Sequence, residues 1–271
     1  MKKHINFNQI RFPGEKDMTM LVHILGAFGW IIFIIGIFFF SQQSMAIAII
    51  SVTTIILYTL LWPLLKYNAF IQGNGVLVTK DQYPEIFSLV TEFIDLFQLQ
   101  DRKEVEVYVI QERGLNAVTI PAFYHNQIML TSDIIESLIQ NRNWDELRAV
   151  VGHELGHHFA RHTDYWLLDV PMHIFPMGII GLYQSRLAEL TGDRAGYFLS
   201  GSLEGTLVAI KKLLTGPILY QHFNSSAYDN QIKTSKASPF LKLTNLFNTH
   251  PYLFERIDKL ITYDKTIKSK N

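Results

Sequence analysis

The chain has 271 residues, with 24 Lys and Arg balanced by 24 Asp and Glu, and it contains no cysteine. A net charge of zero gives no overall electrostatic attraction to nucleic acid. The absence of Cys excludes disulfides, thiolate zinc sites, iron–sulfur clusters and a cysteine nucleophile. A bound metal would therefore take His, Asp and Glu as its ligands. The charges are also unevenly distributed, since residues 18–65 contain no Asp, Glu, Lys or Arg.

The uncharged block holds two apolar segments, Leu21–Phe40 and Met45–Leu65, separated by four polar residues. As helices they would each be about 30 Å long, which is the thickness of the hydrocarbon core of a bilayer. A pair of buried core helices is the alternative, but the run is too long and too evenly apolar for it. A cleaved signal peptide also fits poorly, because no small-x-small site follows. We predict a transmembrane helical hairpin within residues 18–65.

The basic residues near the spans predict their orientation. Lys66 follows the second span, the connection between the spans carries no basic residue, and four basic residues precede the first span: Lys2, Lys3, Arg11 and Lys16. Residues 1–17 are therefore expected to form a cytoplasmic segment, with residues 66–271 on the same side. His23 lies near the end of the first span, which favours an interfacial histidine over a functional group inside the membrane.

The part of the chain after the hairpin reads as one mostly helical domain with a small sheet. Apolar periodicity, turn residues and capping residues predict these elements. In chain order they are a helix over 83–99, strands over 104–110, 115–120 and 127–130, and helices over 132–139, 144–162, 181–199, 203–214 and 251–261. The polar stretch 221–238 reads as a loop or a lid.

One motif carries chemistry: His153-Glu154-Leu155-Gly156-His157, on a predicted helix. Four residues make just over one turn, so both imidazoles project from one face and can bind one metal ion. Glu154 lies beside that ion and can take a proton from a water bound to it. The alternative is a helix with solvent-exposed histidines. His158 and His162 share the four-residue spacing, but no acid adjoins His158, so we prefer the pair His153 and His157. His162 lies at the predicted end of the helix, where a protonated histidine would interact favourably with the helix dipole.

A third ligand must come from elsewhere in the chain. The metzincin extension would need Gly at 160 and His at 163, where this chain has Ala160 and Thr163. Glu189 and Asp193 lie one turn apart on a later predicted helix. One of them can ligate the metal while the other accepts a hydrogen bond from a ligand imidazole. The alternative is that these two acids simply lie on a helix face exposed to solvent, where acids at this spacing are common.

Four features together resemble the membrane zinc metallopeptidases of the HtpX and CAAX-prenyl-protease type, which are gluzincins. The features are Leu115-Asn116-Ala117 before an extended segment, the H-E-x-x-H motif, the segment from Glu189 to Arg194, and Thr249-His250-Pro251 followed by Glu255-Arg256-Ile257. The resemblance covers roughly residues 83–261. It implies an α+β zincin-like metalloprotease domain, mainly α with a small β-sheet, behind the hairpin.

The resemblance also implies roles for individual residues. His153, His157 and Glu189 would bind one Zn²⁺ per chain, Glu154 would be the general base, and Asp193 would orient a ligand. The strand at Asn116 and Ala117 would lie along the cleft as an edge for substrate. His250 would lie near the site, although a plain residue at the start of a helix fits it equally well.

The apolar segment Tyr165–Tyr183 is a candidate third span. It contains Asp169 and two prolines, which are unfavourable in a lone span. A single crossing would also place Glu189 on the opposite side of the bilayer from His153 and His157. If Glu189 is the ligand, the segment does not span, and it is either buried or lies against the membrane surface.

Together these features predict a membrane-anchored zinc endopeptidase, with residues 66–271 as its metallopeptidase domain. We expect a multi-pass protein of the bacterial cytoplasmic (inner) membrane with its catalytic domain facing the cytoplasm. Its substrates would be peptides or proteins, membrane proteins among them, and nucleic acid is not expected as a partner. One alternative is a catalytically silent, membrane-tethered zinc-binding protein of the same fold that recognises a partner. Another is a metal sensor that uses only the His-rich helix.

Overall fold

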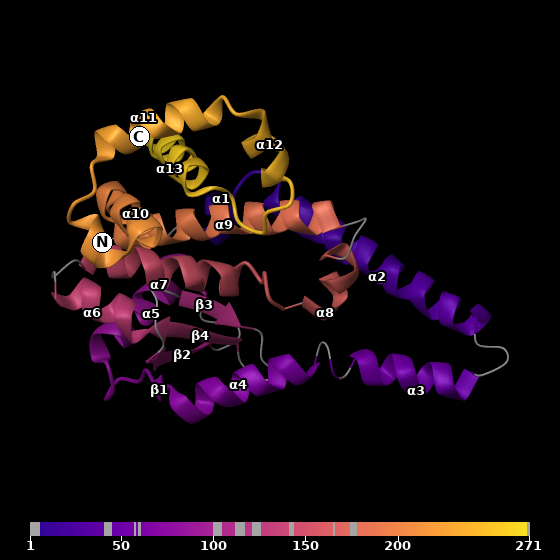
Figure 1. The fold of residues 1–271 in the computed structure, drawn as a ribbon. Helices are drawn as coiled ribbons and strands as arrows, with labels where there is room; N and C mark the ends of the chain where they lie inside the picture. The colour runs from indigo at the N-terminus through magenta and orange to yellow at the C-terminus, as the bar shows by residue number, and fades with distance from the viewer. Residues whose placement is uncertain are drawn as a thin grey trace.

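The computed structural model describes residues 6–40, 45–56, 58, 61–99, 105–111, 117–120, 126–140, 144–164, 166–173 and 178–269. In chain order its helices are α1 (Phe7–Ile10), α2 (Glu15–Phe40), α3 (Met45–Ile56), α4 (Trp62–Asn74), α5 (Pro84–Phe97), α6 (Ser132–Gln140), α7 (Trp144–Phe159), α8 (Trp166–Asp169), the 3-10 helix η2 (Val170–His173), α9 (Gly178–Ser200), α10 (Leu203–Tyr220), α11 (Ser225–Lys236), α12 (Pro239–Asn245) and α13 (Leu253–Lys268). The expected fold class, mainly α with a small sheet, is confirmed. Figure 1 shows a layered body from which α2 and α3 project together.

The sheet has the strand order β1-β2-β4-β3, with β1 (Val76–Leu77), β2 (Val105–Ile110), β4 (Asn126–Thr131) and β3 (Ala117–Ile120). β2 runs parallel to β4, while β1 is antiparallel to β2 and β3 is antiparallel to β4. β2, β3 and β4 fall within or on the strands predicted over 104–110, 115–120 and 127–130. β1 has only two residues, too few to show a period. In the described part of the sheet β3 is an edge strand, so one side of its backbone is open.

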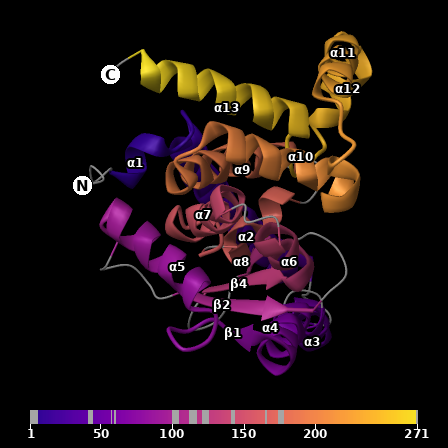
Figure 2. The ribbon, with the colours of Figure 1, turned by 90° about the vertical axis from the view of Figure 1, so that its left-hand side faces the viewer.

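Both faces of the sheet are covered. Successive side chains of a strand point to opposite faces of the sheet, so neighbouring residues of β2 pack into different clusters. On β2, Val107 and Val109 face the main core, to which α5 and α7 contribute. Tyr108 and Ile110 point the opposite way and pack around Ile71 of α4. Seen from the side, the molecule stacks α4, the sheet, α7, then α9 with α10, and finally α13 (Figure 2).

α7 and α9 lie unusually close because small residues face each other between them. A Cβ atom built on Gly196 would lie 2.3 Å from the carbonyl oxygen of Ala149, and one built on Gly156 would lie 2.7 Å from the Cβ of Ala195. Only glycine allows this approach without displacing backbone. The contact places the helix that carries the H-E-x-x-H motif directly against the helix that carries Glu189.

The residues before α2 are part of the body. Phe7 and Ile10 of α1 are buried in the main core, where the Phe7 ring packs edge-on against Phe97 with 5.3 Å between ring centroids. The backbone N–H of Phe12 donates to the hydroxyl of Thr191 on α9 at 2.9 Å. The start of the first apolar helix is therefore anchored in the domain that follows it.

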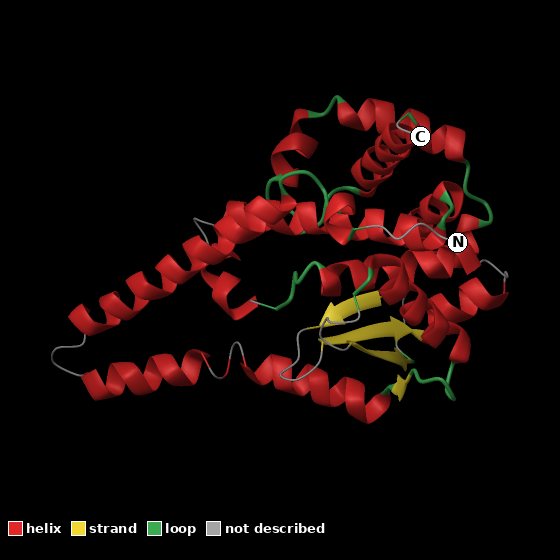
Figure 3. Ribbon diagram, turned by 180° about the vertical axis from the view of Figure 1, so that it is seen from behind, coloured by secondary structure: helices red, strands yellow, loops and turns green. Residues whose placement is uncertain are grey.

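Among the described residues, one helix, Glu15–Phe39, is long and apolar enough to cross a membrane, by its length and composition. Little of its apolar part is buried, and the back view shows it leaving the body (Figure 3). The second predicted span, 45–65, falls on α3 and the first turn of α4. Residues 57, 59 and 60 between these helices, and the predicted connection at 41–44, lie outside the described residues.

The described part of 165–183 forms α8, η2 and the start of α9, and it contains no spanning helix. α8 and η2 pack on α2, where a Cβ on Gly26 would lie 2.2 Å from the carbonyl oxygen of Leu168. The Nδ1 atom of His23 lies 2.6 Å from Oδ1 of the buried Asp169. His23 therefore joins α2 to α8, and its place at the membrane interface stays a prediction.

Several elements differ from the sequence predictions: α10 runs to Tyr220 and α13 to Lys268, beyond the predicted ends at 214 and 261, and α12 was not predicted. The stretch 221–238, expected to be a loop or a lid, contains the helix α11, which the side chain of Asn224 caps by accepting from the N–H of Ala227. This helix is polar on nearly all sides and buries Ile232 alone, so it lacks the apolar stripe that a pattern search detects. α7 ends at Phe159, and His162 follows in a turn in which Arg161 adopts a positive φ of 63°.

Candidate metal centre

Three predicted ligands meet where α7 and α9 pack together. The Nε2 atoms of His153 and His157 lie 3.1 Å apart. Glu189 places one carboxylate oxygen 3.5 Å from Nε2 of His153 and the other 3.4 Å from Nε2 of His157. One candidate ligand atom from each residue lies within 4.8 Å of the other two, so the three could hold a single ion.

The chemistry of this donor set suits zinc. Two imidazole nitrogens and one carboxylate are a common protein ligand set of catalytic zinc, which keeps a further coordination position for water or substrate. The side chains of His153, His157 and Glu189 are between 11% and 14% exposed, so the cluster is sheltered but can be reached from solvent. The residues present therefore fit the group that the family resemblance implies.

Asp193 and Arg256 support the cluster from behind. Asp193 lies 3.1 Å from Nδ1 of His153, the ring nitrogen that faces away from Glu189. Arg256 of α13 donates two hydrogen bonds to Asp193, at 2.9 and 2.6 Å, and lies 3.1 Å from Glu189. Burial would raise the pKa of both carboxyls, but the charge of Arg256 and the hydrogen bonds that the two groups accept together outweigh burial and lower both pKa values. Both groups are therefore held as carboxylates.

The electrostatics of the cluster favour a cation. Burial lowers the pKa of His153, yet hydrogen bonds to Asp193 and Glu189 outweigh burial and raise this pKa to about 10. Such a shift shows that the two buried carboxylates stabilise positive charge at the imidazole. A metal ion bound at Nε2 supplies that charge in place of the proton.

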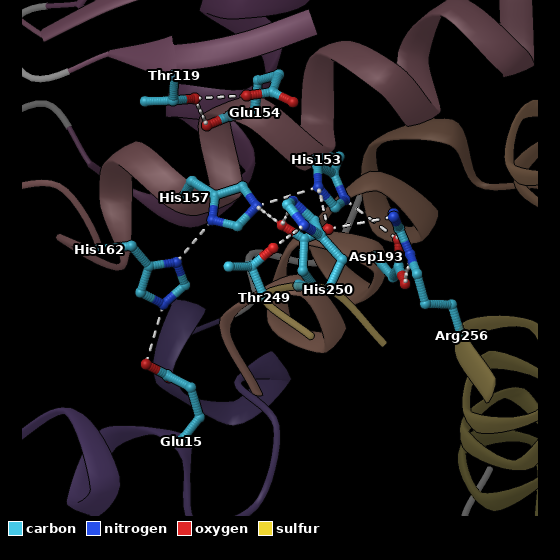
Figure 4. A network of polar contacts seen from close by, with 11 residues as sticks. Glu15, Thr119, His153, Glu154, His157, His162, Asp193, Thr249, His250 and Arg256 are labelled. Atoms are coloured by element: carbon cyan, nitrogen blue, oxygen red, sulfur yellow. Dashed lines mark hydrogen bonds and ion pairs between the residues drawn. The ribbon is translucent and has the colours of Figure 1, made fainter. Parts of the chain in front are cut away.

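The second imidazole has a different support. Nδ1 of His157 lies 2.9 Å from Nδ1 of His162, and Nε2 of His162 lies 2.9 Å from a carboxylate oxygen of Glu15 (Figure 4). Burial lowers the pKa of His162 to about 4, so this residue is neutral at neutral pH. The expectation that His162 acts as a cation at the helix end was therefore wrong, because the residue turns inward and contacts a candidate ligand.

Glu154 lies beside the cluster and outside it. Its carboxylate accepts a 2.7 Å hydrogen bond from the hydroxyl of Thr119, which also donates to the carbonyl of Glu154 at 3.0 Å (Figure 4). Thr119 belongs to β3, so the edge of the sheet is tied to the H-E-x-x-H helix at this residue. The sequence analysis missed Thr119, whose only signal was its place in a predicted strand near Ala117.

Two cavities adjoin the cluster and together form a cleft beside β3. The first, of about 250 Å³, has mainly apolar walls, with Ile134, Val150, Ile210 and Leu213 among them. The second, of about 440 Å³, includes the polar residues Thr163, Gln184, Ser185 and Thr249 in its lining. Ala117, Glu154, Glu189 and His250 line both cavities, so the candidate metal site lies between them.

The remaining predicted site residues lie as follows. Ala117 begins β3 and borders both cavities, whereas Asn116 lies outside the described residues. His250 is at the site: its Nε2 lies 3.5 Å from Glu189 and its Nδ1 lies 2.8 Å from the hydroxyl of Thr249. Its side chain is 66% exposed, so it borders the cleft and is free of close packing.

Comparison with known proteins gives two matches. The model of peptidase family M48 matches residues 80–175. A protein described as a Protease HtpX homolog, from Streptococcus uberis, is 22% identical over 267 aligned residues, which cover 76% of this chain and 85% of the relative. The resemblance to the HtpX-like peptidases of family M48 is confirmed. No solved structure matches the chain.

The M48 match includes the H-E-x-x-H segment and ends before Glu189, which the fold brings to the same place. The two matches support a protease of the metalloprotease class. With the apolar helix α2, the HtpX-like relative also suggests that the chain associates with a membrane. A protease implies peptide or protein substrates.

Proposed function

We propose that the chain is a membrane-anchored, zinc-dependent endopeptidase that hydrolyses peptide bonds of protein substrates. The observation that carries the proposal is the juxtaposition at the cleft. His153, His157 and Glu189 form a compact candidate metal site, and Glu154 stands next to it on the side of an open strand edge.

His153, His157 and Glu189 are the proposed zinc ligands. Zinc bound there supplies a Lewis acid that polarises the scissile carbonyl and lowers the pKa of a water molecule to about 7. Glu154 takes a proton from the attacking water and delivers it to the amine nitrogen as the C–N bond breaks, so that a carboxylic acid and a free amine leave. The hydrogen bond from Thr119 holds the Glu154 carboxylate at the cleft for both transfers.

The cleft supports cleavage within a chain. An extended peptide can pair with the open edge of β3, with side chains entering the cavities on either side of Glu189. Because space continues on both sides of the metal site, neither end of a substrate needs to lie there. Ala117 and its neighbour Asn116 are the proposed backbone contacts, and His250 borders the site of the scissile bond.

The membrane arrangement is part of the proposal. α2 would be the first span, and residues 45–65 would return the chain to the same side. Basic residues flank both predicted spans and are absent between them, which favours cytoplasmic placement of the catalytic domain. The proposed location is the cytoplasmic membrane of a bacterium.

The test is Glu154→Gln in the full-length protein, purified in detergent, loaded with zinc and incubated with an unfolded protein such as casein. We expect cleavage to fall by about 10²–10⁴-fold because the general base is lost, with zinc content unchanged. Asp145→Asn is the matched control, since this exposed acid lies on the same helix and away from the cleft. Its activity should equal that of the wild type.

Two outcomes would contradict the proposal. Undiminished cleavage by Glu154→Gln would remove Glu154 from the reaction. A wild-type protein that binds one zinc ion and cleaves nothing would favour the partner-recognition protein or the metal sensor, both of which need the metal and no base.

A further inference from the structure

The two candidate ligand imidazoles are supported in different ways on the side that faces away from the metal site. Asp193 lies directly against Nδ1 of His153 at 3.1 Å. Among the described residues, the partner of Nδ1 of His157 is another imidazole, that of His162, at 2.9 Å. A carboxylate, Glu15, follows only beyond this second ring, 2.9 Å from Nε2 of His162.

If His157 binds a metal ion, the hydrogen bonds from His157 through His162 to Glu15 allow only one arrangement of the protons. Nε2 of His157 faces Glu189 and must be unprotonated to bind a metal, so its Nδ1 carries the hydrogen and donates it. His162 then accepts at Nδ1 and donates from Nε2 to Glu15, whose carboxylate can only accept. The carboxylate at the far end thus fixes the tautomer of both rings.

Glu15 is placed to do this. It is the first residue of α2, its side chain is fully buried, and Arg11 donates two hydrogen bonds to it at 2.5 and 2.9 Å. The hydroxyl of Thr19 donates a further bond at 2.9 Å. Arg11 also reaches the carbonyl of Ala160, just after α7, at 3.3 Å. These contacts hold the start of the apolar helix against the end of the H-E-x-x-H helix.

We propose that Glu15 is a positioning residue of the metal centre, which acts through His162 to set the tautomer and orientation of His157. The cytoplasmic start of the membrane helix is then part of the zinc site. The proposal rests on the zinc site proposed above. It predicts that anchor and catalytic domain cannot be separated without weakening metal binding.

The experiment measures the zinc dissociation constant of full-length protein in detergent, by competition with a chelating dye. Glu15→Gln should raise the Kd about 10- to 100-fold, the usual effect of removing a carboxylate that supports a ligand histidine. Asp17→Asn is the matched control, because this exposed acid lies two residues further along the same helix, and its Kd should equal that of the wild type. Thermal unfolding in the presence of chelator checks that each variant folds without metal.

A double-mutant cycle separates the relay from a general loss of structure. His162→Phe should raise the Kd as much as Glu15→Gln, and adding Glu15→Gln to it should change the Kd by less than about twofold, because the connection is already broken. Equal losses from Glu15→Gln with and without His162 would overturn the relay, as would wild-type affinity in Glu15→Gln. If Glu15→Gln does not fold, His162→Phe alone decides, and an unchanged Kd overturns the proposal.

This experiment distinguishes the two proposals. A wild-type chain that binds no zinc would overturn both. A wild-type chain that binds zinc tightly, with Glu15→Gln equal to it, would overturn the role of Glu15 and leave the proposed peptidase intact.

Discussion

Two acids one helical turn apart, Glu189 and Asp193, have different surroundings in the folded chain. Glu189 faces the Nε2 atoms of both histidines, whereas Asp193 faces Nδ1 of His153 and a buried Arg256. The spacing of the acids alone left their roles open between ligand and orienting partner. The geometry favours Glu189 as the proposed ligand, because its carboxylate lies on the Nε2 side of both rings, where the three side chains could hold one ion.

This difference predicts graded effects on metal binding. Glu189→Ala should lose zinc, because one of three protein ligands is gone. Asp193→Asn should keep zinc with an affinity about 10- to 100-fold weaker, because only the support of His153 is lost. The zinc content after dialysis tests the loss of metal in Glu189→Ala. The zinc Kd, measured in competition with a chelator, tests the weaker binding in Asp193→Asn. Loss of metal in Asp193→Ala together with retention in Glu189→Ala would reverse the two roles.

The helix pair α7 and α9 is the element on which the site depends. The proposed ligands come from both helices, so the separation of the two backbones sets the distance from Glu189 to the histidines. Gly196 allows the close approach because a Cβ there would collide with the carbonyl oxygen of Ala149 at 2.3 Å. A Cβ on Gly192 would likewise lie 2.8 Å from the ring of His153.

We therefore expect Gly196→Ala to destabilise the fold by about 1–3 kcal/mol, the usual range for overpacking, and to weaken zinc binding as the helices move apart. Gly73→Ala is the matched control, since it is also a helical glycine and no heavy atom lies within 4 Å of its added methyl group. The control should be neutral or slightly stabilising. Denaturant unfolding and zinc titration of both variants test this, and unchanged stability and affinity in Gly196→Ala would contradict it.

On the scale of the whole molecule, the apolar helix α2 is built into the catalytic body. Its first turn holds Glu15 against His162, its middle contacts α8 through Gly26 and His23, and the residues before it fill part of the core. The rest of α2 leaves the body with α3 (Figure 1). With α2 as the proposed membrane span, its orientation would set the orientation of the cleft relative to the bilayer.

The orientation can be tested with single cysteines in this cysteine-free chain. Ser41→Cys lies in the predicted connection between the spans, and Ser226→Cys lies on the exposed face of α11. With an impermeant thiol reagent on intact cells, or spheroplasts if an outer membrane blocks access, we expect labelling at position 41. Position 226 should label only after permeabilisation. Labelling at 226 in intact cells would place the catalytic domain on the outside.

The amino-acid sequence by itself determined the elements whose signal is local. The spacing of His153 and His157 predicts a metal-binding helix because one helical turn places both imidazoles on one face. The alternation of apolar residues over 104–110 predicts β2. The long uncharged run predicts the membrane segment, to which α2 corresponds. The polar helix α11 was not predicted because it buries almost no apolar side chain. The strand β1 was not predicted because it is too short to show a period.

Only the tertiary structure decided which distant side chains support the site. Thr119 lies 35 residues from Glu154, Arg256 lies 63 residues from Asp193, and Glu15 lies 147 residues from His162. A hydrogen bond between such partners leaves no periodicity in the sequence, since any donor near any acceptor can make it. The strand order, the packing of α7 on α9 and the docking of α1 bring these residues together. The local pattern thus specifies the two candidate ligand histidines, while long-range packing specifies how each one is held.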